Sequence, residues 1–117
     1  MAAVEISYVN DGVVNRPRSL VKWAGMATGQ ANGALTVAGQ LGLVGAAQIS
    51  GTFGGATITL QCSNDGTTWF NMSDVSGTAM TATGNSFFEF STAALYIRPA
   101  ISGGTGDDVD VTLVLRG

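Results

Sequence analysis

The end of the chain alternates apolar and polar residues with a period of two. Val109, Val111, Leu113 and Leu115 are separated by single residues such as Asp110 and Thr112. Successive side chains of a β-strand point to opposite faces of a sheet, so this period predicts a strand with one buried face. Residues 56–63 show the same pattern, with Ile58, Leu60 and Cys62 on the apolar side.

Turn-rich segments divide the rest of the chain into further short strands. These are predicted at residues 5–9, 19–24, 35–38, 47–53, 68–72, 86–90 and 95–101. No helix is predicted, because each of the glycines in residues 39–47 would cost a helix about 1 kcal/mol relative to alanine. With 117 residues there is room for one domain. We therefore expect an all-β protein, a single antiparallel β-sandwich or small barrel.

The tripeptide Asn-Asp-Gly occurs twice, at residues 10–12 and 64–66, each time between two predicted strands. Asp-Gly favours a hairpin turn because glycine accepts a positive φ and aspartate tolerates one. The second copy is followed closely by Trp69. We expect Asn64-Asp65-Gly66 to close a hairpin and Trp69 to enter the next strand, with its ring in the core near Ile58 and Leu60.

Residues 1–20 differ in character from residues 21–117, which we assign to the sandwich. They are rich in valine and end in the stiff Arg16-Pro17-Arg18. They are predicted to form either an N-terminal hairpin of the sandwich or an arm that pairs with a neighbouring subunit. Pro17 lacks a backbone donor and is expected at a junction. The candidate contacts to a capsid or to another subunit are Val4, Ile6, Tyr8, Val14, Arg16 and Arg18.

Histidine is absent, which removes the usual general base and the commonest zinc ligand. No phosphate-binding loop or dinucleotide motif is present. The carboxylates of Asp107, Asp108 and Asp110 fit no EF-hand loop. Asp107 and Asp108 are expected in a solvated turn, and Asp110 is expected to point outward from the final strand. The other acidic residues are scattered along the chain. We expect no catalytic residue, no metal and no cofactor, and hence not an enzyme.

The net charge of −3 argues against a nucleic-acid partner, which would require several basic residues aimed at phosphates. No apolar run approaches the ~20 residues of a membrane span, and no export signal precedes the first strand. Cys62 has no cysteine partner and is expected to act as a small buried hydrophobe. Few charges together with a mean hydropathy of +0.30 favour assembly with other subunits.

Three segments resemble small virion proteins of tailed bacteriophages. These are GTFGGATITLQCSNDGTTW at residues 51–69, LYIRP at 95–99 and DVTL at 110–113, so the likeness covers roughly residues 47–116. It implies a head decoration, or cement, protein that binds the major capsid protein on the outer surface of the head, commonly as a homotrimer, without catalytic residues. The protein would then belong to the virion, assembled in the host cytoplasm. SNDGTTW and YIRP are also similar to discoidin-like jelly-roll domains, but the chain is short and lacks disulfide-forming cysteines.

Two other functions stay open at this point. One is a glycan-binding or host-binding β-sandwich module of a phage tail or fibre, for which Trp69 and Tyr96 are the candidate glycan contacts. The other is a tail-tube or tail-completion protein, which would form hexameric rings. Capsid decoration by a jelly-roll-like sandwich is the leading expectation.

Overall fold

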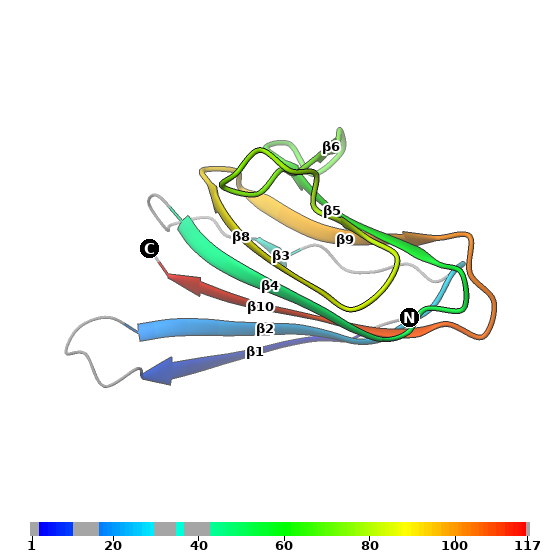
Figure 1. Cartoon of the computed structure of the whole chain (residues 1–117). Coiled ribbons are helices and arrows are strands. Elements are labelled where there is room, and N and C mark those ends of the chain that lie inside the picture. Colours follow the sequence, from blue (N-terminus) through cyan, green and yellow to red (C-terminus); the bar gives the residue numbers. More distant parts are fainter. Residues whose placement is uncertain (1–2, 11–16, 30–34, 37–42, 117) are drawn as a thin grey trace.

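The computed structural model describes residues 3–10, 17–29, 35–36 and 43–116. All regular elements in these residues are β-strands, which Figure 1 shows as two facing layers. The strands are β1 (Ala3–Asn10), β2 (Pro17–Met26), β3 (Leu35–Thr36), β4 (Leu43–Thr52), β5 (Thr57–Ser63), β6 (Phe70–Asn71), β7 (Thr81–Ala82), β8 (Ser86–Thr92), β9 (Tyr96–Ser102) and β10 (Asp108–Arg116). Every strand pair is antiparallel. The predicted all-β, antiparallel sandwich is thus confirmed.

The first sheet, sheet A, has the order β1-β2-β10-β4-β8, and sheet B has the order β3-β9-β5-β6, with β7 also paired to β5. The chain crosses between the sheets at each step from β2 to β5 and again at each step from β7 to β10. An eight-stranded core of this kind, β2-β10-β4-β8 facing β3-β9-β5-β6, is the arrangement of a jelly roll. β1 adds a strand outside it, paired with β2 from Ala3 opposite Ala24 to Asn10 opposite Pro17.

Most predicted strands lie where the alternation placed them. The exceptions are short: the strand expected over residues 68–72 is reduced to Phe70–Asn71, and β7, only two residues long, was missed because it is too short to show a period. Part of the strand expected at residues 35–38 lies outside the described residues, as do Asp11 and Gly12 of the first Asn-Asp-Gly turn.

The core lies between the two sheets, and β10 illustrates how the alternation builds it. Val109, Val111, Leu113 and Leu115 are all buried, as the period of two predicts. The largest side chain with no exposed surface is Trp23 of β2. Sheet B contributes Ile58, Leu60 and Ile97, and Cys62 packs partly buried against the same cluster. That burial raises the pKa of the Cys62 thiol.

Gly45 of β4 has a packing role in this core. A Cβ atom at this position would lie 2.7 Å from Cζ of Phe90 and 2.8 Å from Cδ2 of Leu115. The missing side chain leaves room for the Phe90 ring, which crosses the β4 backbone from the neighbouring strand. Gly45, which would destabilise a helix at this position, is therefore required for the packing of β4 against Phe90 and Leu115.

Candidate functional site

The loop between β5 and β6 is closed by its own polar side chains. Ser63 Oγ donates to Asp65 Oδ1 at 2.9 Å and accepts the backbone N–H of Gly66 at 2.9 Å. Asp65 Oδ1 also accepts the N–H groups of Thr67 and Thr68, each at 2.8 Å. Asp and Ser side chains commonly organise turns in this way. β5 and β6 do pair as a hairpin, as predicted, but the connection is longer than a tight Asp-Gly turn.

These hydrogen bonds lower the pKa of Asp65 to about 2, chiefly through the N–H groups of Thr68 and Thr67. Because the folded-state pKa lies below the ordinary value of ~3.9, the contribution to stability is present above pH ~4 and is lost as the pH falls toward 2. We expect a carbon-13 titration of the Asp65 carboxyl to have its midpoint near 2. A midpoint close to the ordinary value would mean that the loop is not held by this carboxylate.

The prediction that Trp69 packs in the core is wrong. Trp69 is half-buried, and the guanidinium carbon of Arg98 lies over its ring, 4.1 Å from the centroid. Residues 64–69 leave the alternating pattern of β5, so Trp69 comes to the outer face of sheet B instead of reaching Ile58 and Leu60 on the inner face. The structure brings it against a residue 29 positions later (98 − 69) that the sequence did not single out.

Arg98 is the centre of a polar group on that outer face. Its Nε donates to Gln61 Oε1 at 2.9 Å, and Gln61 Nε2 donates to Asn71 Oδ1 at 3.1 Å. The register of β5, β6 and β9 sets these residues side by side, with Gln61 opposite both Arg98 and Asn71. We call Gln61, Trp69, Asn71 and Arg98 the Arg98 cluster. A signal was present in the sequence, because Arg98 is the one basic residue between Lys22 and Arg116.

Tyr96, the other candidate glycan contact, lies on the same face two residues before Arg98. It is half-buried, and the loop lies against its ring: a Cβ atom on Gly66 would lie 3.6 Å from ring atoms Cε2 and Cζ. The structure therefore brings Trp69 and Tyr96 to one face, as a shared site would require. It also places a residue of the same chain against each ring, Arg98 over Trp69 and Gly66 beside Tyr96.

Carboxylates at the start of β10 and in the turn before it form hydrogen bonds with the end of β2 and the residues that follow it. Asp107 Oδ2 accepts from the backbone N–H of Thr28 at 2.9 Å and from its hydroxyl at 2.6 Å. The pKa of Asp107 is lowered, first by the Thr28 side chain. Asp110 accepts the N–H of Gly25 at 2.9 Å and lies 3.7 Å from Lys22 Nζ. These carboxylates have structural partners, which the sequence-based view of a solvated turn did not include.

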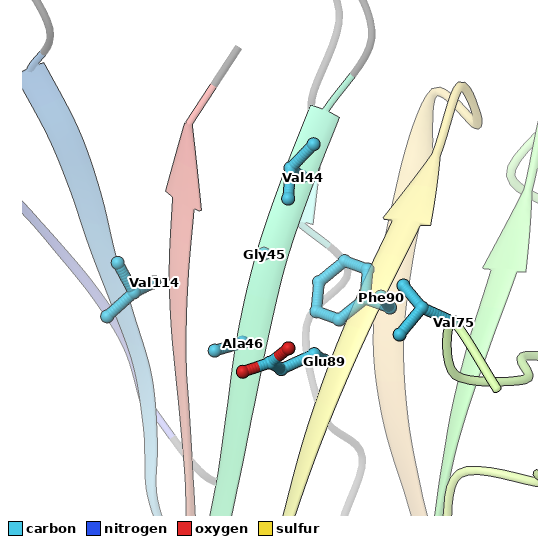
Figure 2. A pocket seen from close by; sticks show the side chains of 7 residues that line it. All are labelled: Val44, Gly45, Ala46, Val75, Glu89, Phe90 and Val114. Carbon is cyan, nitrogen blue, oxygen red and sulfur yellow. The ribbon is translucent and has the colours of Figure 1, made fainter.

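The outer face of sheet A carries a hollow of about 300 Å³. Its lining residues come from β4, β8, β10 and the loop before β7: Val44, Gly45, Ala46, Val75, Glu89, Phe90 and Val114. Figure 2 shows Val75 beside Phe90 at the edge of β8, and the Glu89 carboxylate close to Ala46. The loop is fixed there by a hydrogen bond from the Val75 N–H to the Glu89 carbonyl, 2.9 Å. We call this the sheet A hollow.

The candidate contacts in the N-terminal segment fall mostly on β1 and β2. The backbone register sets Val4 opposite Trp23, Ile6 opposite Val21 and Tyr8 opposite Ser19. Arg18 is the register partner of Val9. Val14 and Arg16 lie outside the described residues. β1 is the outermost strand of sheet A.

Among the described residues, no three His, Cys, Asp or Glu side chains are grouped so that they would hold a metal ion. The same part of the chain contains no helix long and apolar enough to cross a membrane. Comparison with protein-family models, with curated proteins and with solved structures gives no match to this chain.

Proposed function

We propose that the protein is a structural virion protein that decorates the outer surface of a phage head, binds the major capsid protein and stabilises the shell. The resemblance of residues 47–116 to small virion proteins supports this function. The jelly-roll arrangement agrees with it, since this fold recurs in viral capsid domains, although a fold alone does not determine a function. A homo-oligomer, with a trimer favoured, is part of the proposal.

The observation that carries the proposal is the exposure of three apolar side chains on and beside the outer face of sheet A. Val75 and Phe87 are 64% and 63% exposed, and Val44 is 42% exposed. All three lie on or beside the strands that line the sheet A hollow. Clustered apolar side chains on a sheet face mark interaction surfaces, because covering them removes apolar area from water. A cement protein works in this way, by adding buried area across the joints between capsid subunits.

β1 offers a second kind of contact. It is an eight-residue strand whose only partner in the described residues is β2. The other edge of sheet A differs, because the Val75 N–H covers the Glu89 carbonyl of β8. An open edge strand can pair with a strand of another chain through backbone hydrogen bonds. The candidate contacts Val4, Ile6 and Tyr8 lie on this strand.

The test is binding of the purified protein to phage heads that lack their decoration. We expect it to sediment with the heads and to raise their melting temperature, because each bound copy adds buried area that unfolding must expose. A variant with Val75→Ser and Phe87→Ser removes apolar surface that is already exposed, so it should fold normally and bind at least about tenfold more weakly. Wild-type protein that leaves the heads unbound and their melting temperature unchanged contradicts the proposal.

The two alternatives have less support. Trp69 and Tyr96 share one face, as a glycan site would require, but Arg98 already covers one face of the Trp69 ring and the loop at Gly66 lies against Tyr96. A sugar stacks on an open ring face. A tail-tube protein would form hexameric rings, which mass photometry of the purified protein distinguishes from a trimer.

A further inference from the structure

We infer that the Arg98 cluster is a docking point for a carboxylate of an acidic protein segment. The inference deepens the proposed function, on which it rests for the identity of the partner: the acidic segment would belong to the capsid surface. The site is separate from the sheet A hollow, because it lies on the outer face of the opposite sheet.

Arg98 is held in one orientation before any partner arrives. The Trp69 ring supports the guanidinium plane at 4.1 Å, and the hydrogen bond from Nε to Gln61 fixes its rotation at 2.9 Å. Gln61 is in turn held by Asn71 at 3.1 Å. The terminal nitrogens of the guanidinium then present N–H groups in the planar fork that matches a carboxylate. A fixed side chain loses little rotamer entropy on binding, which favours a tight contact.

The positive charge of Arg98 has no counter-ion among the described residues. The ion pair found there joins Lys22 and Asp110 on sheet A. Asp65 and Asp107 are occupied by loop hydrogen bonds, and Asp74 accepts the N–H groups of Ser76 and Thr78. Segments 30–34 and 37–42, which flank β3 in the sequence, contain no Asp or Glu. Arg98 is also the one basic residue in the sequence of sheet B, so no neighbouring cation would attract an anion in its place.

A protein carboxylate fits this site better than an acidic sugar. Sugar recognition by aromatic residues uses an open ring face, whereas Arg98 covers a face of Trp69 and Gly66 lies against Tyr96. An Asp or Glu side chain needs only the guanidinium fork. Trp and Arg are also the residue types that most often dominate the binding energy of protein interfaces. An acidic peptide segment is therefore the occupant we propose.

The first experiment is a nuclear magnetic resonance titration of the nitrogen-15-labelled full chain with a hexaglutamate peptide. We expect saturable shifts of the Arg98 Nε–H and Trp69 indole signals, while the buried Trp23 indole stays unchanged. Lys22→Gln removes the same charge from sheet A and should leave these shifts intact, whereas Arg98→Gln, which has no Nε–H group, should abolish the shift of the Trp69 indole signal. A hyaluronan tetrasaccharide is titrated in parallel. Absence of shifts with the peptide, or tighter binding of the sugar, overturns the inference.

The second experiment compares Arg98 variants for binding to undecorated heads. Arg98→Gln should weaken binding by about 30-fold, and Arg98→Lys, which keeps the charge but loses the fork, by less. Melting temperatures that fall by no more than about 5 °C, the cost of losing the stacking with Trp69, establish that the fold is retained. Equal binding of wild type and variants overturns the inference and leaves the proposed function standing. If the wild type itself does not bind heads, the proposed function fails, and the peptide titration still decides the ligand preference of the cluster.

Discussion

Replacing Trp23 with alanine is expected to lower the free energy of unfolding by about 3–5 kcal/mol, the usual loss for truncating a large buried aromatic residue. Trp23 has no exposed surface and is the largest fully buried side chain in the described residues. Its removal leaves a cavity between the two sheets that the neighbouring side chains fill only in part. Urea denaturation followed by fluorescence or circular dichroism measures the change as a lower midpoint at constant slope.

Trp69→Ala is the matched control, because it deletes the same side chain from the outer face of sheet B. Here the loss is the stacking with Arg98, about 1 kcal/mol. The two variants should therefore differ by several-fold in their effect on stability. Comparable losses from both would place Trp69 in the core after all, and would contradict the arrangement of the Arg98 cluster.

Gly54→Ala is expected to destabilise the fold by about 2–4 kcal/mol, from a strained backbone and a steric clash together. Gly54 has a φ of +56°, and a Cβ atom there would lie 2.1 Å from the carbonyl oxygen of Thr105. The Thr105 N–H also donates to the Gly54 carbonyl at 3.0 Å, so the two loops meet backbone to backbone. Neither backbone can move aside without breaking this contact. The midpoint of thermal or urea unfolding gives the loss.

Gly55→Ala separates the two causes. Gly55 has a φ of +87°, but the nearest atom to its Cβ position is 3.8 Å away. Gly55→Ala should lower the free energy of unfolding by about 1–2 kcal/mol, the cost of holding alanine at a positive φ. If Gly54→Ala costs no more than Gly55→Ala, the close approach to Thr105 does not contribute to the stability of the loops.

The period of the sequence was enough to predict strands and their buried faces. In β10 and β5, alternation identified both the element and the side that reaches the core. Burial of these residues depends only on which face of the strand they occupy. That face follows from the residue's position in the alternating pattern of the sequence. The hairpin between β5 and β6 was likewise predicted from Asn64-Asp65-Gly66, because turn chemistry is local.

The same reasoning failed at Trp69 because the loop that carries it has no period. An aromatic residue after a turn fits either face of a sheet, and apolar character alone favoured the core. The contact that decides its position comes from Arg98 on β9, placed by pairing of β9 with β5. Thr28 and Asp107, 79 residues apart, illustrate the same limit. The residues near either partner in the sequence give no indication that the two will form a hydrogen bond.

The sequence by itself determined that this chain is an all-β sandwich without histidine chemistry, and it predicted the residues of the core on β5 and β10. Only the tertiary structure decided the jelly-roll order of the strands, the hollow on the outer face of sheet A and the Arg98 cluster. The physical reason is that strand periodicity is a property of neighbouring residues. Strand order and surface clusters arise from hydrogen bonding and packing between segments far apart in the chain.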